Sequence, residues 1–368
     1  METFAPMTHE PVRGSYPDPA VVALPGTARM GTPSKAVIPR PPIHHLFGLV
    51  PVDAGPGTST FEMPASPWLQ TSAGVFFGAT AALVADAPLG GAILSEIQPW
   101  HVVTTSELSL SFLRPATVAS AKLTSRASLI GLGRSQGLAE ATVNDAEGRL
   151  LAHSTSRYFI LALPPQEGVV PPEPAPIEDP VFDTPDPWAR PIPPALVDPD
   201  LLELCRTKPG LELMTAGLHG TIPPPPFAVL FGIGLTDVRE GTVSAALRAT
   251  EWLASPARTV YGGVLAFLAD MAMTSAVTTT LPAASSCATL DITLHFLRPG
   301  ICDGRDITVS GEVVHRGRTL AVTRAQVANA DGKPLVVATG SSMVLEGRPW
   351  ADVAVADVAA GDPRDNDE

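Results

Sequence analysis

Two aspartates each stand in a long apolar segment, eight residues after a glycine: Asp86 follows Gly78, and Asp270 follows Gly262. A carboxylate in apolar surroundings loses solvation and becomes more basic, which suits a general base or nucleophile near neutral pH. A glycine at a helix start lets a ligand approach unpaired backbone N–H groups, which stabilise a developing oxyanion. An Asp in this setting can also be a buried hydrogen-bonded carboxylate. In the sequence Asp86-Ala87-Pro88 it could cap a new helix.

The spacing within each motif predicts how two such motifs must cooperate. If Gly262 and Asp270 lie on one helix, they are about 12 Å apart along its axis, so they cannot both contact one carbonyl group. A working site then requires the carboxylate of one motif to face the glycine turn of the other across a pseudo-two-fold axis. We therefore expect Asp86 to face Gly262 and Asp270 to face Gly78.

The two motifs belong to a longer internal repeat with a constant offset of 184 residues, from Gly78 to Gly262. The offset also relates Leu46-Phe47-Gly48 to Leu230-Phe231-Gly232 and Trp68-Leu69 to Trp252-Leu253 without a gap. A register that never slips indicates a duplicated domain. We assign repeat 1 to residues 25–161 and repeat 2 to 209–345.

The remaining segments are rich in proline or acidic residues and lack apolar periodicity. We expect a mobile proline-rich arm at 1–24 and a proline-rich acidic linker at 162–208, with a short helix near its end. We also expect a disordered acidic tail at 346–368.

Each repeat combines one helix that is apolar on every side with a series of alternating strands. Such a helix is buried all round, and the run 289–296 alternates with the period of two that is typical of a strand. The sequence therefore predicts an α+β fold of two hotdog domains, each a curved antiparallel sheet wrapped around one long apolar helix. The two domains are expected to form an intramolecular pseudo-dimer.

The second repeat resembles the PaaI-like branch of the hotdog acyl-CoA thioesterases. The resemblance rests on Gly262-Gly263 with Asp270, on Leu297-Arg298-Pro299, on the segment 314–318 and on Ala330-Asp331-Gly332; repeat 1 is similar to a more divergent member. It implies that a glycine-turn N–H polarises the thioester carbonyl group and that the helix carboxylate attacks it or activates water.

The resemblance also implies roles for further residues. The family places a hydroxyl nine residues before the Arg of the Arg-Pro corner, which corresponds to Thr105 and Thr289. An acyl pocket between the helices would be lined by Phe77, Leu83, Tyr261 and Phe267, with Gly263 also at the substrate. Arg134 and Arg318 could reach coenzyme A phosphates or be solvated turn residues.

Composition narrows the class of partner. The formal charge of −13, with 24 Lys and Arg against 37 Asp and Glu, argues against nucleic acid. Three cysteines and no metal-ligand spacing predict no metal, and no cofactor beyond the coenzyme A carried by the substrate. No membrane association is expected, and cytoplasmic localisation is the default. Homo-oligomers of the fused pseudo-dimer remain open.

Three functions are compatible with this pattern. The first is hydrolysis of an acyl-CoA, and the second is a non-catalytic acyl-thioester binding or scaffold module. The second stays open because many relatives carry His where this chain has Phe77 and Tyr261, and Asn where it has Thr71 and Ser255. A hotdog dehydratase or hydratase is less favoured, because no Gly-Asp-x-Asn-Pro-type stretch lies near a usable His.

Overall fold

The computed structural model describes residues 7–30, 37–176, 181–197 and 199–349. Repeat 1 contains α1 (Gly26–Arg29), α2 (Pro42–Phe47), β1 (Val50–Gly55), β2 (Thr58–Pro64), α3 (Thr80–Leu94), β3 (His101–Phe112), β4 (Lys122–Leu132), β5 (Gln136–Asn144) and β6 (Leu150–Ala162). After α4 (Pro199–Thr207), repeat 2 contains α5 (Gly210–Leu218), α6 (Pro226–Phe231), β7 (Ile233–Arg239), β8 (Thr242–Arg248), α7 (Gly262–Thr278), β9 (Ser286–Phe296), β10 (Asp306–Arg316), β11 (Leu320–Ala328) and β12 (Pro334–Leu345).

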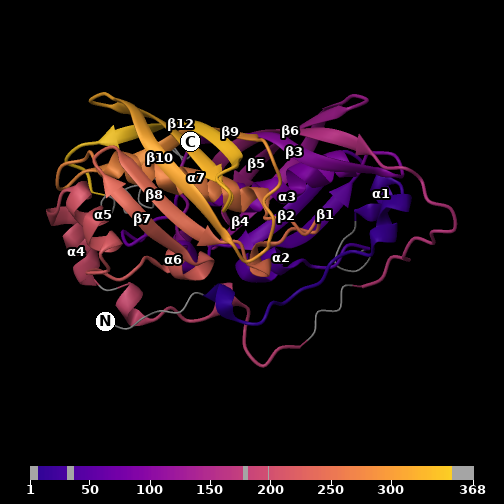
Figure 1. The fold of residues 1–368 in the computed structure, drawn as a ribbon, viewed down its shortest axis with the longest axis horizontal. Coiled ribbons are helices and arrows are strands. Elements are labelled where there is room, and N and C mark those ends of the chain that lie inside the picture. The colour runs from indigo at the N-terminus through magenta and orange to yellow at the C-terminus, as the bar shows by residue number, and fades with distance from the viewer. Residues whose placement is uncertain (1–6, 31–36, 177–180, 198, 350–368) are drawn as a thin grey trace, which may run out of the picture.

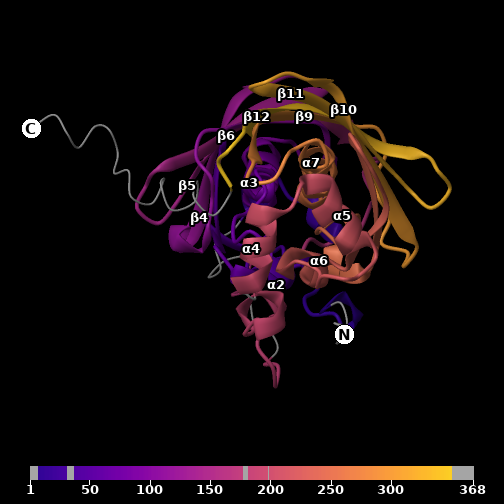
Figure 2. The same cartoon turned by 90° about the vertical axis from the view of Figure 1, so that its left-hand side faces the viewer.

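All twelve strands form one antiparallel sheet in the order β1-β2-β4-β5-β6-β3-β9-β12-β11-β10-β8-β7. The second half of this order repeats the first in reverse, as two hotdog domains joined edge to edge require. Figure 1 shows the two halves, and Figure 2 shows the sheet arching over α3 and α7, which lie beside each other in its concave face. The predicted α+β fold of two hotdog domains is confirmed.

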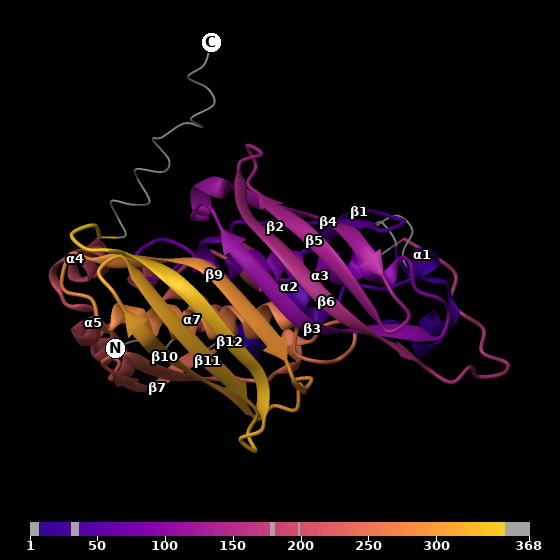
Figure 3. The same ribbon diagram turned by 90° about the horizontal axis from the view of Figure 1, so that it is seen from above.

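The join between the domains is the pairing of β3 with β9, seen from above in Figure 3. Ser109 pairs with Thr293, its own counterpart in the other repeat, and their hydroxyl oxygens are 3.0 Å apart. Leu108 pairs with Leu294 and Leu110 with Ile292. The pseudo-two-fold axis therefore passes through the Ser109–Thr293 pair, and the interface is isologous, like that of a symmetric dimer.

The central helices are held by burial on all sides. Twelve of the fifteen residues of α3 and fifteen of the seventeen of α7 are buried. Complete burial of apolar side chains is worth about 1.5–3 kcal/mol for each large one. Asp86 lies within α3, so the alternative that it caps a new helix is wrong.

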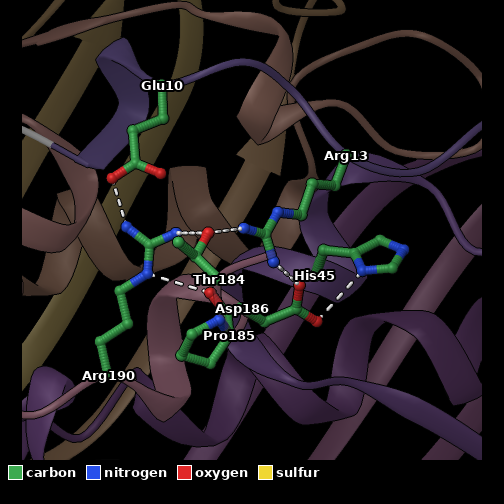
Figure 4. Close-up of polar contacts among 7 residues, drawn as sticks. All are labelled: Glu10, Arg13, His45, Thr184, Pro185, Asp186 and Arg190. Carbon is green, nitrogen blue, oxygen red and sulfur yellow. Dashed lines mark hydrogen bonds and ion pairs between the residues drawn. The ribbon is translucent and has the colours of Figure 1, made fainter. Parts of the chain in front are cut away.

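The proline-rich arm, over its described residues 7–24, contacts the linker and α2. Arg13 is 6% exposed and bonds through Nη1 to Asp186 of the linker at 2.9 Å, and His45 of α2 approaches the same carboxylate at 3.1 Å (Figure 4). Glu10 forms an ion pair with Arg190 of the linker. These polar contacts join the arm to the linker and α2, although the arm sequence has no periodic apolar pattern.

The arm and linker also complete the two repeats. The indole N–H of Trp68 donates to the carbonyl of Arg190 at 2.8 Å, and that of Trp252 donates to the carbonyl of Glu10 at 2.9 Å. The indole N–H groups of these two equivalent tryptophans thus find their acceptors in the linker and the arm, which lie outside the repeats. Of the predicted disordered tail, residues 346–349 are placed and Ser286 donates to the Arg348 carbonyl at 2.6 Å. The rest of the tail, 350–368, and arm residues 1–6 lie outside the described residues.

Candidate active sites

The Asp270 carboxylate reaches the glycine turn of repeat 1. Its Oδ2 accepts a hydrogen bond from the backbone N–H of Ala79 at 2.9 Å. Its Oδ1 accepts from the hydroxyls of Thr289 at 2.9 Å and Thr274 at 3.2 Å, which are 3.1 Å from each other. Three donors from α3, α7 and β9 therefore fix the orientation of one carboxylate.

The Asp86 carboxylate makes the reciprocal contact with the turn of repeat 2. Its Oδ2 accepts from the N–H of Gly263 at 3.1 Å. Oδ1 accepts from the hydroxyl of Tyr158, a β6 residue, at 3.5 Å. The expected swap, in which each carboxylate faces the turn of the other repeat, is present on both sides of the pseudo-two-fold axis.

The N–H groups that donate to the carboxylates are those of Ala79 and Gly263, one residue after the glycines to which the thioester donor was assigned, and Gly262 also bonds to Asp86. Gly262 serves the site by its lack of a side chain, because a Cβ there would lie 2.7 Å from Asp86 Oδ2. A Cβ on Gly78 would lie 3.2 Å from the Phe112 ring. The glycines thus allow close approach.

Burial changes the acidity of both carboxyl groups. Asp270 is fully buried, and this desolvation raises its pKa against the lowering effect of the bonds from Ala79, Thr289 and Thr274. Desolvation also raises the pKa of Asp86, to about 6, against the bonds from Gly263, Tyr158 and Gly262. Each group is therefore a stronger base than a solvated aspartate.

Two cavities share lining residues next to the hydroxyl that bonds to Asp270. The helix-side cavity, about 300 Å³, is bounded by α5, α6 and the C-terminal half of α7. The strand-side cavity, about 580 Å³, lies between the ends of β3 and β12 and the start of β9. Phe76, Gly78 and Thr289 line both. The hydroxyl that bonds to Asp270 thus stands where the cavities join.

The two cavities differ in chemistry. The helix-side cavity is lined mainly by apolar groups, among them Leu213, Met214, Phe227, Met271 and Leu281. The strand-side cavity has two cationic side chains on its wall, Arg114 and Arg348. One side of the Asp270 site therefore suits an apolar group and the other suits an anionic one.

Asp86, Gly262 and Gly263 line neither of these cavities. Tyr158 stands where repeat 2 has Ser342, and a Cβ on Gly90 would be 3.2 Å from its hydroxyl oxygen. The counterpart of Gly90 is Thr274, so the tyrosine takes the position of a hydroxyl that serves Asp270. Thr105, the counterpart of Thr289, bonds to Tyr158. Asp86 is left with one long hydroxyl bond.

Tyr261 closes the same region from the other repeat. Its hydroxyl donates to the carbonyl of Leu83 at 3.0 Å and accepts from the N–H of Ala87 at 2.8 Å. These two groups would bond to each other in a regular α-helix. The tyrosine hydroxyl is inserted into α3 immediately before Pro88, where the proline ring also disturbs the helix.

Both repeats match the same protein family. The thioesterase superfamily profile matches residues 73–152 and again residues 257–336. Each match spans a glycine turn, its central helix and the strands that follow. Both repeats are thioesterase superfamily domains. Thioester hydrolysis is accordingly the reaction class of this chain.

Solved structures with some similarity include hotdog thioesterases. Acyl-CoA thioesterase II from Mycobacterium marinum is 12% identical over 83% of this chain and 97% of its own, with a TM-score of 0.48. The E. coli PaaI protein of the phenylacetic acid degradation operon is 24% identical over 36% and 94%, with a TM-score of 0.33. A Streptococcus pneumoniae thioesterase protein with coenzyme A is 24% identical over 32% and 88%, with a TM-score of 0.30. No curated protein matches the sequence.

The residues expected to bind substrate in these thioesterase domains divide into two groups. Phe77 lines the helix-side cavity and packs edge-on against Phe227 and Phe267. Tyr261, Leu83, Phe267 and Gly263 line neither of these two cavities. Phe267 is instead fully buried and stacks on Phe231 at 4.8 Å.

The two turn arginines lie away from the thioesterase site. Arg134 and Arg318 are exposed in hairpin turns and line neither cavity. Thr274, Tyr158 and the cavity residues Arg114 and Arg348 were not predicted as site residues. The repeat could have pointed only to Thr274 and Tyr158, because these residues differ in type from their counterparts Gly90 and Ser342.

Among the described residues, no group of three or more His, Cys, Asp or Glu side chains is placed to hold a metal ion. None of their helices is both long enough and apolar enough to span a membrane.

Proposed function

We propose that this chain hydrolyses an acyl-CoA thioester at the Asp270 site alone. The observation that carries the proposal is the junction of the two cavities at Gly78 and Thr289, beside a carboxylate that Ala79, Thr274 and Thr289 orient. An apolar acyl group then extends to one side of the reacting carbon, and the coenzyme A arm extends to the other.

The division of labour in the turn follows from the hydrogen bonds. The N–H of Ala79 holds the Asp270 carboxylate, and the N–H of Gly78 is the proposed donor to the thioester oxygen. This donor stabilises the oxyanion that forms when the carbonyl carbon is attacked. Gly78 lines both cavities, so the thioester can approach its backbone closely.

Asp270 acts as the general base in the proposed reaction. The ionised carboxylate takes a proton from water as the water oxygen bonds to the thioester carbon. When the tetrahedral intermediate collapses, the C–S bond breaks, and the same carboxyl group returns the proton to the leaving thiolate. Thr289 and Thr274 donate to Oδ1 throughout and keep the base in position.

Coenzyme A is placed in the strand-side cavity because its phosphates need cationic partners. Arg114 and Arg348 are cationic side chains on that wall, and guanidinium groups bind phosphate strongly. Arg114 already bonds through Nη1 to the carbonyl of Leu150 at 2.9 Å, so its direction is fixed in part. No separate cofactor enters the proposed step.

The test is release of free thiol from acyl-CoAs of several kinds, combined with binding of the matching S-alkyl coenzyme A thioethers, which lack a cleavable carbonyl group. We expect both hydrolysis and binding, with binding weakened about tenfold in the double variant Arg114→Gln, Arg348→Gln. Arg134→Gln with Arg318→Gln is the matched control and should bind as the wild type does.

The alternative is a non-catalytic module that binds acyl thioesters and keeps the fold. It is supported by the absence of the usual His before either glycine turn, where Phe77 and Tyr261 stand. Binding of thioethers without thiol release from any acyl-CoA would establish this alternative and end the hydrolase proposal.

A further inference from the structure

The helix-side cavity follows the C-terminal half of α7 away from the catalytic carboxylate. Met271, Thr274, Ser275 and Thr278 line it in turn, each on the same face of the helix at spacings of three, one and three residues. From Asp270 to Thr278 the helix advances about 12 Å at 1.5 Å per residue. The cavity is therefore a channel with a defined direction.

The far end of this channel is lined by residues of the segment that connects the repeats and by the start of α5. The backbone N–H of Gly210, the first residue of α5, donates to the carbonyl of Leu281 at 3.0 Å. A Cβ on Gly210 would lie 1.8 Å from the Thr278 carbonyl oxygen. The start of α5 is thus pressed against the end of α7, and Cys205 of α4 and Lys208 line the cavity beside this contact.

The lining of the far end favours an uncharged group. Lys208 is the one charged side chain in the lining, and its Nζ bonds to Glu212 at 2.9 Å, one helical turn further on. The Cys205 thiol has a pKa that burial raises above the usual value, so it is neutral near pH 7. A carboxylate at the end of an acyl chain would have to compete with Glu212 for Lys208.

The same path is filled in repeat 1. The counterparts of Ser275 and Thr278 are Gly91 and Leu94. A Cβ on Gly91 would lie 2.8 Å from the terminal carbon of Met30 and 2.8 Å from the Ser59 hydroxyl. Met214, the counterpart of Met30, lines the open cavity instead. The channel is therefore a property of repeat 2.

We propose that this channel takes a straight, uncharged acyl chain of medium length, and that the inter-repeat residues Cys205 and Lys208 set its limit. An extended chain gains 3.3–3.6 Å for every three bonds, or about 1.2 Å per bond, so about 12 Å accommodates roughly ten bonds. An acyl group of about eight to ten carbons fits. This inference rests on the proposed hydrolysis at Asp270.

The experiment measures kcat/KM on saturated acyl-CoAs from four to sixteen carbons for the wild type, Cys205→Phe and Thr278→Leu. The wild type should peak near eight to ten carbons. Each variant should move the peak to shorter chains by two or more carbons. Thr278→Leu installs the residue that repeat 1 carries at the equivalent position, Leu94.

Glu203→Phe is the matched control, because it adds the same ring at an exposed position of α4 and should leave the profile unchanged. A wild-type profile that is flat, or one that Cys205→Phe and Thr278→Leu leave in place, overturns the chain-length inference while hydrolysis stands. Preference for an eight-carbon dicarboxylic acyl-CoA over octanoyl-CoA overturns the uncharged terminus. If no acyl-CoA releases thiol, the proposed function itself fails.

Discussion

The two composite sites have the same plan and different surroundings. At both, a carboxylate from one central helix accepts an N–H from the glycine turn of the other repeat. Asp270 also has two threonine hydroxyls, and one of them, on Thr289, lines both cavities, whereas Asp86 has one tyrosine hydroxyl, and Tyr158 lines neither cavity. A motif therefore sets where a carboxylate lies, and its neighbours determine whether a substrate can reach it.

The largest expected difference lies in the carboxylates themselves. Asp270→Asn should lower kcat about 10²- to 10⁴-fold, the usual contribution of a general base. Asp86→Asn should leave kcat within about threefold, because that site is closed by Tyr158 and Tyr261. Steady-state thiol release measures both. Equal losses in the two variants would show that the two sites are equivalent.

The next difference concerns stability and pH. The folded pKa of about 6 for Asp86 is above the ordinary 3.8, so the folded protein holds this proton more tightly than the unfolded chain. That stabilisation is complete below about pH 4 and is lost as the pH rises through about 6. Relative to Asp86→Asn, the wild type should lose about 2 kcal/mol of unfolding free energy between pH 4 and pH 7.

Urea unfolding of both proteins at pH 4 and pH 7 provides the measurement. The comparison cancels the contribution of Asp270, whose pKa is also raised and which is unchanged in both. If the difference in unfolding free energy between the two proteins does not vary with pH, the pKa of Asp86 is not raised in the folded protein, and the inferred desolvation of this carboxylate is wrong.

The threonine pair offers a smaller, more specific contrast. Thr289→Ala removes a hydroxyl that donates to Asp270 Oδ1 at 2.9 Å, and a bond to a charged acceptor is worth about 1.5–3 kcal/mol. We expect kcat to fall about 10- to 100-fold and the acidic limb of the pH profile to move to higher pH. Thr289→Ser should restore both. Thr105→Ala should change neither, since Thr105 bonds to Tyr158.

The smallest expected effect concerns the tyrosine inserted into α3. Tyr261→Phe deletes the hydroxyl that joins the Leu83 carbonyl to the Ala87 N–H, leaving buried backbone groups without that partner. The unfolding free energy should fall by about 1–3 kcal/mol, as measured by urea denaturation. Activity should be nearly unchanged. A large loss of kcat would place Tyr261 in a working site.

Much of this arrangement could be predicted from the sequence because it follows from lengths and periods. A constant offset of 184 residues revealed the duplication. The spacing of eight positions from glycine to aspartate required the carboxylate of each repeat to face the glycine turn of the other repeat. These arguments need only the rise of a helix and the spacing of residues.

The features that separate the two sites could not be predicted in this way. Tyr158 and Ser342 occupy equivalent positions, but nothing in a single sequence tells that a tyrosine ring 72 residues after Asp86 reaches its carboxylate. The bonds from the Ala79 and Gly263 N–H groups to the carboxylates were not predicted, because a motif indicates a turn, whereas packing sets the direction of each N–H within it. The contacts between the arm and the linker could not be predicted, because ion pairs leave no periodic pattern in the sequence.

The pairing of Ser109 with Thr293 has a consequence for how such a chain can change. In a dimer of identical subunits, the codon for a tyrosine that closes one site would close its twin as well, and the lineage would lose the reaction. When both halves are encoded in a single gene, different codons specify the two sites, so each site can change independently. One composite site can then accumulate tyrosines and a proline as a scaffold while the other site keeps the chemistry.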